Sequence, residues 1–247
     1  MKAYHQLLIA LLFFACQAPE NDEPIQNWLN KPLNVSAIQE VTNTYHMFDS
    51  TGSKVGSMIF GFYRKDGRLV ARDTSRFDDG SVYEDAEFKL DSSFQMQHVS
   101  IGMQVNTTGL KVDLSMTNKL VKGIYEITRD TAVQQFPIDS LHNYDVVREE
   151  LYMLLHATDF TKGDTLNFTS LVTTSMTVST SSLYYIGQEE VTVPAGTFNC
   201  TVVHLMTDGK MPQNRIWITN DEPKRIVKFH VPGPKLSIEL METRQSL

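Results

Sequence analysis

Short segments that alternate apolar and polar residues constrain this chain more than any other feature of its sequence. From about Ile38 onward such segments recur, most regularly over residues 85–90, 110–116 and 236–240. Successive side chains of a strand point to opposite faces, so this pattern predicts strands with one wet face and one buried face. Turn residues such as Lys65-Asp66-Gly67 separate the segments and favour hairpins. The sequence therefore predicts a mainly β protein, built as an antiparallel partial barrel or curved sheet.

One segment departs from the period of two. Its apolar residues recur at helical spacing and are Tyr144, Val147, Leu151, Leu154 and Leu155. This spacing predicts one main helix from about Asn143 to Ala157. Within it, Glu149 and Glu150 are expected to be solvated charges, and Glu84 is expected on the wet side of its strand.

The N-terminus has the pattern of a secretory signal. Lys2 precedes an unbroken apolar run from Leu7 to Ala15, which is shorter than the ~20 residues that span a bilayer as a helix. Ala15-Cys16 resembles a lipobox, the site where signal peptidase II cuts and the new terminal cysteine is acylated, although Phe13 and Phe14 depart from the usual pattern. We expect residues 1–16 to be a signal peptide with a lipobox and Cys16 to be lipidated. The alternative is an ordinary signal peptide with a chance cysteine.

The number of cysteines favours the hypothesis that Cys16 is lipidated. The chain has only Cys16 and Cys200, whereas exported domains normally use cysteines in pairs. If Cys16 is acylated, Cys200 has no partner, so we expect a buried thiol and no disulfide. A disulfide between the two would tie a flexible tail to a core strand.

The rest of the chain divides into a short polar segment and a large domain. Residues 17–32 contain three prolines and several acidic residues, which predicts a flexible tether. Residues 33–247 are expected to form a single β-rich domain. The acidic stretch at residues 17–23 loosely resembles a tract that directs lipoproteins to the cell surface, and a plain solvated linker is the alternative.

Charge and hydropathy limit the partners of the protein. A formal net charge of -7 with scattered Lys and Arg argues against a nucleic-acid partner. No second apolar run approaches spanning length, so the membrane is expected to be reached through the lipid anchor. The expected location is the cell envelope, anchored to the outer membrane and either periplasmic or surface-exposed.

A motif near the C-terminus carries a family resemblance. Val193-Pro194-Ala195-Gly196-Thr197-Phe198 is followed by Ile216-Trp217 and then by residues 223–228. Over Gly187 to Met241 the chain resembles an uncharacterised family of envelope proteins, a domain of unknown function with a VPAGTF turn. The resemblance implies a partial barrel similar to lipoprotein carriers that cradle acyl chains, and it implies no catalytic residue. From the residues alone, Gly196 permits a positive φ at a sharp turn, after which Phe198 is expected to enter the core.

A concave apolar sheet face predicts a binding site for an apolar or lipid-like ligand. Methionine adapts to irregular apolar guests, and several methionines fall at expected inward positions. The candidate ligand-binding residues are Met58, Phe60, Met116, Met176, Trp217 and Phe229, and Met96, Met103 and Met206 are further inward methionines. Ordinary core packing is the alternative for all of them.

The sequence lacks the usual signatures of catalysis and metal binding. It contains no HxH, HExxH, CxxC or GxSxG pattern, so we expect no metal, no cofactor and no enzyme activity. The predicted function is an envelope lipoprotein that binds an apolar ligand in a concave β-sheet. The alternative is a structural or protein-interaction lipoprotein without a small ligand. Convergent titratable groups in a cleft would instead indicate an enzyme.

Overall fold

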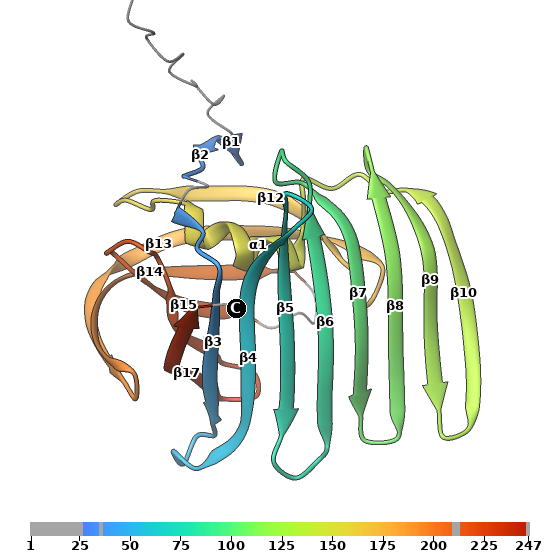
Figure 1. Cartoon of the computed structure of the whole chain (residues 1–247), viewed down its shortest axis with the longest axis horizontal. Coiled ribbons are helices and arrows are strands. Elements are labelled where there is room, and N and C mark those ends of the chain that lie inside the picture. The colour runs from blue at the N-terminus through green and yellow to red at the C-terminus, as the bar shows by residue number, and fades with distance from the viewer. Residues whose placement is uncertain (1–26, 35–36, 209–212, 246–247) are drawn as a thin grey trace, which may run out of the picture.

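Most of the chain lies in one curved antiparallel sheet (Figure 1). The computed structural model describes residues 27–34, 37–208 and 213–245. Within these residues the sheet has 15 strands in the order β10-β9-β8-β7-β6-β5-β4-β3-β17-β16-β15-β14-β13-β12-β11. Its end strands β10 and β11 do not pair with each other, so the sheet stays open. The predicted fold class, a mainly β curved sheet with one main helix, is confirmed.

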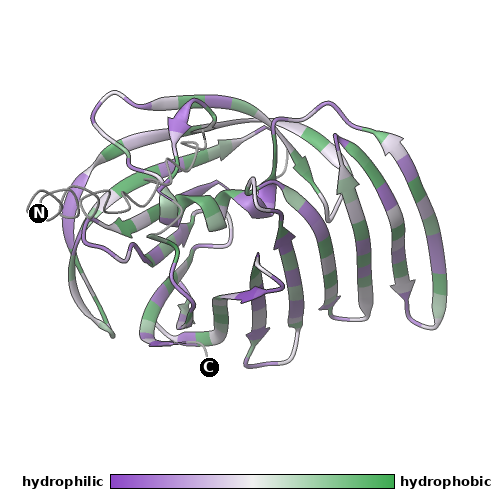
Figure 2. Ribbon diagram, turned by 45° about the horizontal axis from the view of Figure 1, so that its top comes forward, coloured by the Kyte–Doolittle hydropathy of each residue, from purple (hydrophilic) through white to green (hydrophobic). Residues whose placement is uncertain are grey.

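The N-terminal half of the sheet is a meander of eight strands joined by short turns. The strands are β3 (Val41–Phe48), β4 (Lys54–Lys65), β5 (Arg68–Phe77), β6 (Val82–Leu90), β7 (Met96–Val105), β8 (Thr108–Thr117), β9 (Leu120–Arg129) and β10 (Ala132–Leu141). Figure 2 shows the alternation of apolar and polar residues along β7 to β10 that the sequence indicated. Asp66 and Gly67 connect β4 to β5 with φ values of 52° and 73°, as a tight two-residue hairpin requires.

The C-terminal half contains the helical segment and a second meander. Its elements are β11 (Val146–Val147), α1 (Arg148–Leu154), a 3₁₀ turn (Leu155–Ala157), β12 (Thr165–Val172), β13 (Thr177–Val193), β14 (Gly196–Thr207), β15 (Asn214–Thr219), β16 (Ile226–Val231) and β17 (Leu236–Gln245). Antiparallel pairing of β17 with β3 joins this half to the first, with Ile238 opposite Met47. The described parts of both halves therefore share one continuous sheet.

The segment before the sheet is partly described. Strands β1 (Asn27–Trp28) and β2 (Lys31–Pro32) form a separate two-stranded sheet, and Leu29 between them packs on the core. Lys31 Nζ lies 2.5 Å from Asp164 Oδ2. The predicted signal peptide, the lipidation site Cys16 and most of the predicted tether lie outside the described residues.

The helix is shorter than the sequence predicted. We expected it to begin near Asn143, but Val146 and Val147 form a parallel pair with Ser170 and Leu171 of β12, and α1 begins only at Arg148. This pairing satisfies backbone groups that the first helical turn would otherwise leave open. The expectation that Glu149 and Glu150 are solvated was also wrong, because both carboxylates face the interior.

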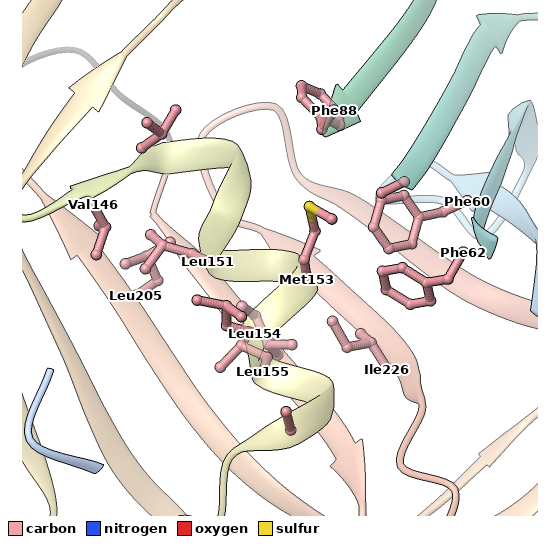
Figure 3. Close-up of a cluster of buried hydrophobic side chains, with 14 of the residues drawn as sticks. Phe60, Phe62, Phe88, Val146, Leu151, Met153, Leu154, Leu155, Leu205 and Ile226 are labelled. Atoms are coloured by element: carbon pink, nitrogen blue, oxygen red, sulfur yellow. The ribbon is translucent and has the colours of Figure 1, made fainter. Parts of the chain in front are cut away.

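The main core lies between the concave face of the sheet and α1. Figure 3 shows Met153 and Leu154 of the helix among side chains from both halves of the sheet, including Phe60 and Ile226. Met153, Leu154 and Ile226 are fully buried. A helix presenting apolar side chains on several sides is thus enclosed by the curved sheet, which explains why so short an element has such strong apolar content.

The C-terminal motif adopts the predicted turn. Gly196 has a φ of 136°, a backbone conformation that residues other than glycine rarely adopt. It is the first residue of β14, directly after the turn. Phe198 is only partly buried, so the expectation that it enters the core holds in part, and Cys200 is the fully buried residue that follows. The Cys200 thiol is free, as predicted, and burial raises its pKa to about 12.

Candidate functional site

A cavity of about 210 Å³ lies where α1 crosses the concave face of the sheet. It is partly open to solvent, and most of its lining is apolar. The lining residues are Met58, Phe60, Asp73, Glu84, Phe88, Glu149, Tyr152, Asn214, Phe229, Val231 and Ile238. They come from both meanders and from the helix, so the site forms only when the whole sheet has curved around α1.

Two carboxyl groups interrupt the apolar pattern of the sheet face. Asp73 on β5 lies opposite Phe60 on β4, and Glu84 on β6 lies opposite Ser75, which in turn faces Met58. Directly opposed residues of an antiparallel pair share a face, so both carboxyl groups project to the same side as Phe60 and Met58. Ser75 Oγ donates a hydrogen bond of 2.9 Å to Asp73 Oδ1. The expectation that Glu84 lies on the wet side of its strand was therefore wrong.

A third carboxyl group reaches the cavity from the helix. Glu149 accepts a hydrogen bond of 2.7 Å from Thr173 Oγ1 on its Oε1, whereas its buried Oε2 has no partner among the described residues. Asn214 of β15 also lines the cavity, is 6% exposed and donates from Nδ2 to the hydroxyl of Tyr152. The Oδ1 atom of Asn214 likewise has no partner among the described residues. We call Asp73, Glu84 and Glu149 the carboxyl cluster.

Burial sets the electrostatics of the carboxyl cluster. Loss of solvent, followed by the neighbouring Glu84, raises the pKa of Asp73 to about 7. Burial also raises the pKa values of Glu84 and Glu149, and the hydrogen bond from Thr173 and the charge of Arg148 offset only part of the shift at Glu149. No Lys, Arg or His is among the described residues that line the cavity. The cluster therefore lacks a cation on the cavity side.

Aromatic side chains form much of the apolar lining beside the carboxyl cluster. Phe60, Phe88 and Phe229 line it, and we call them the aromatic wall. The ring of Phe229 makes edge contacts with Tyr45 and Tyr152 at centroid distances of 6.0 and 5.9 Å. These contacts fix Phe229 at the junction between the helix and the C-terminal meander.

Three of the six predicted ligand-binding residues meet at this cavity. Met58, Phe60 and Phe229 all line it, although they come from strands in different halves of the sheet. The structure places the other three elsewhere. Met116 is buried and lines a second hollow of about 460 Å³ next to Leu29.

Met176 and Trp217, the other two predicted ligand-binding residues, do not line the cavity. Met176 lies between β12 and β13 with a φ of 52°, away from the cavity. Trp217 is covered by the cationic side chains of Arg215 and Lys228, at 4.9 and 5.7 Å from its ring centroid. Met206, expected to face inward, is instead 38% exposed.

The functional groups that sequence reasoning missed are the polar ones. Asp73 lies in phase with the buried Leu69 and Ala71, and Glu84 lies in phase with the buried Ala86 and Phe88. The period of two thus held a signal for both carboxyl groups. Nothing in the sequence marked Glu149 or Asn214, because their positions depend on how the helix packs across the sheet.

The described residues contain neither a metal-binding cluster nor a membrane-spanning helix. No group of three or more His, Cys, Asp and Glu side chains in these ranges is arranged to hold a metal ion. None of the helices in the described part of the chain has the length and apolar character needed to cross a membrane.

Comparison with known families decides the affiliation. Residues 92–236 match the family described as protein of unknown function DUF3108. The chain belongs to this family. The match includes most of the segment from Gly187 to Met241 on which the resemblance rested, and it begins well before Tyr144, so the similarity extends further toward the N-terminus than the motif indicated. No curated protein matches the chain.

One of three similar solved structures supports the fold. A β-barrel-like protein of the domain of unknown function DUF1849 from Brucella abortus is 9% identical with a TM-score of 0.54, covering 85% of this chain and 99% of its own. A protein from Bacteroides fragilis, described as exported and of YmcC-like fold, is 10% identical with a TM-score of 0.33, covering 83% and 96%. A protein from Parabacteroides distasonis, described as a lipoprotein, is 11% identical with a TM-score of 0.32, covering 83% and 95%. The first similarity shows that this DUF3108 member has a barrel-like fold.

Proposed function

We propose that this DUF3108 protein binds an apolar or lipid-like ligand on the concave face of its sheet. The observation that carries the proposal is the partly open cavity between α1 and the aromatic wall, lined mainly by apolar side chains. Ligand sites in proteins are commonly concave, apolar and furnished with a few convergent polar groups. This cavity has all three properties.

The size of the cavity limits what it can hold. Its volume of about 210 Å³ is below the ~300 Å³ typical of pockets for drug-sized ligands. A dry apolar cavity of ~150 Å³ nevertheless admits benzene. The site therefore suits a small molecule, or one end of a longer chain that continues through the open side.

Export and anchoring are part of the proposal. The apolar run that ends at Ala15-Cys16 supports a lipid anchor in the outer envelope. Cys16→Ala should move the protein from the membrane fraction to the soluble fraction of the cell. An unchanged distribution would overturn the anchor.

We assign the cavity to binding rather than to catalysis. Carboxyl groups of raised pKa in a cleft also occur in acid–base enzymes. Among the described lining residues, however, there is no Ser, Cys, Lys or His, so the carboxyl cluster and Tyr152 would have to supply every acid, base and nucleophile. We propose binding because most of the lining is apolar, which suits a ligand with a hydrocarbon body.

The binding test uses a neutral probe and a blocked cavity. We expect saturable binding of hexan-1-ol to the purified protein, followed by calorimetry or by shifts of amide signals around α1. Val231→Phe should weaken it at least tenfold by filling the cavity, whereas Val178→Phe, at a 40% exposed site, should not. Absence of saturable binding to the parent would overturn the proposal.

A protein-interaction role is the second candidate. Exposed apolar side chains gather on the unpaired end of the sheet, where Val133, Phe136 and Leu141 of β10 are 56%, 44% and 76% exposed. An open sheet edge with apolar side chains can pair with another chain. Concentration-dependent self-association that Val133→Lys abolishes, in a protein that fails to bind hexan-1-ol, would favour this role.

A further inference from the structure

The cavity contains buried hydrogen-bond acceptors that have no donor among the described residues. The buried Oε2 of Glu149 and the Oδ1 of the 6% exposed Asn214 both lack a partner among the described residues. A buried polar atom without a partner costs free energy, so such atoms usually meet water or a ligand. Here both unpartnered atoms accept hydrogen bonds and belong to residues that line the same cavity.

The charges of the lining have the same sign. Asp73 and Glu84 occupy neighbouring cross-strand pairs on one sheet face, and Glu149 reaches them from α1. Glu84 contributes to the electrostatics of both other carboxyl groups, which shows that the three interact. A ligand with a carboxylate or phosphate head would meet repulsion here, whereas an ammonium group brings three donors and a positive charge.

We propose that the cavity selects organic amines, placing an alkylammonium group at the carboxyl cluster and an apolar body against the aromatic wall. This inference rests on the proposed function and names the chemical class of its ligand. The apolar wall favours a cation with a hydrocarbon body over a bare metal ion. The volume of about 210 Å³ suits a short alkyl chain, or the amine end of a longer amphiphile.

The selectivity for amines should increase with pH. An alkylammonium group, like a lysine side chain, stays protonated up to about pH 10. Within the cluster, Asp73 loses its proton near neutral pH, because its pKa is about 7. Other titratable or charged groups near the cluster are Tyr152 in the cavity lining, Asp85 on β6, Arg148 and Glu150 on α1, and Tyr45 on β3, which interacts with Asp73 and with Arg225.

The experiment compares three probes of equal chain length on the full chain: hexylamine, hexan-1-ol and hexanoate. At pH 8 we expect hexylamine to bind at least tenfold more tightly than hexan-1-ol, and hexanoate to bind more weakly than either. From pH 5 to pH 8 the affinity for hexylamine should rise at least fivefold, with no change for hexan-1-ol.

Variants separate the charge effect from loss of the cavity. Asp73→Asn and Glu149→Gln should each reduce hexylamine affinity at pH 8 about tenfold, on the scale of a buried charge-assisted contact. Both should reduce hexan-1-ol affinity far less than hexylamine affinity, because a neutral alcohol brings no positive charge to the cluster, and thermal melting curves measured separately show whether the variants fold. Asp85→Asn is the matched control, because Asp85 lies on the same strand as Glu84 and pairs with Arg72 at 3.1 Å on the outer face.

The outcomes distinguish the two proposals. If hexan-1-ol binds and hexylamine gains no advantage, the amine inference is overturned and the apolar site stands. Equal loss of hexylamine affinity in Asp85→Asn and Asp73→Asn would also overturn it, because a general surface-charge effect would then explain the selectivity. If no probe binds, the proposed function itself fails.

Discussion

Strands β4 and β10 belong to the same sheet, yet their inner faces have opposite environments. On β4, Met58, Phe60 and Phe62 are buried beneath α1, whereas on β10 Phe136 is 44% exposed and only Ile138 is partly buried. Phe136 occupies the same cross-strand row as Phe60, and the five strands β5 to β9 lie between them. The row therefore begins in the cavity and ends in solvent.

The length of the helical segment explains the difference. The helical segment from Arg148 to Ala157 is too short to cover a face of fifteen strands. It therefore covers the centre of the sheet and leaves the end at β10 exposed, which we call the bare end. At the covered end, burial gives the carboxyl cluster its raised pKa values. At the bare end, no such constraint acts on side chains, so the two ends should respond differently to substitution.

The largest expected change in the free energy of unfolding comes from truncating a buried side chain at the end of the sheet that α1 covers. Leu154→Ala removes a fully buried helical side chain and should lower the free energy of unfolding by about 3 kcal/mol. Leu141→Ala is the matched truncation at the bare end, where Leu141 is 76% exposed, and should change it by less than about 0.5 kcal/mol. Urea denaturation measures both, and similar losses would show that the bare end is covered in solution.

A strained backbone position near the bare end should make a substitution costly there too. Gly123 lies on β9 near the bare end, has a φ of 152°, and a Cβ there would approach the carbonyl oxygen of Asp113 to 1.9 Å. Gly123→Ala should therefore cost about 2–3 kcal/mol despite its position. Gly102→Ala on β7, with nothing nearer than 3.9 Å, is the control. A Gly123→Ala protein as stable as the control would contradict the strained geometry.

The carboxyl cluster gives the covered end a distinctive pH dependence. The folded pKa of Asp73 is about 7, above its unfolded value, so the folded state holds the proton more tightly. This contribution to stability is present below about pH 4 and is lost as pH rises through 7. Asp73→Asn should therefore raise the free energy of unfolding at pH 8 by about 2 kcal/mol, discounted for partial exposure, and change it little at pH 4.

The difference in the free energy of unfolding between variant and parent reports on Asp73 alone, even though another buried group has the opposite pH dependence. Burial lowers the pKa of His156 to about 4, so that histidine destabilises the fold as pH falls below its unfolded value. Because His156 is present in both proteins, its contribution cancels in the difference. Equal stabilisation by Asp73→Asn at pH 4 and pH 8 would contradict the raised pKa.

The period of two predicted the sheet well because each strand follows local stereochemistry. It also brought Met58 and Phe60 to the correct face. The helix start was misjudged because Tyr144 and Val147 fit a helical spacing, while pairing of Val147 with Leu171 is a long-range interaction. Glu84 was misplaced because it was assigned to water by residue type rather than by its phase along the strand, whereas the position of Glu149 depends on how α1 packs across the sheet.

The smallest expected effect tests whether the bare end carries any function. Phe136→Lys replaces an exposed apolar side chain on the edge strand β10, at a position with a ring contact of 6.3 Å to Tyr125. Because the site is already 44% exposed, the free energy of unfolding should fall by less than about 0.5 kcal/mol. A lysine on an edge strand also opposes pairing with another chain. Hexan-1-ol binding should be unchanged, since none of the described residues that line the cavity comes from β7 to β10. Loss of hexan-1-ol binding on this substitution, measured beside an unchanged melting curve, would show that the inner face acts as one continuous site from β4 to β10.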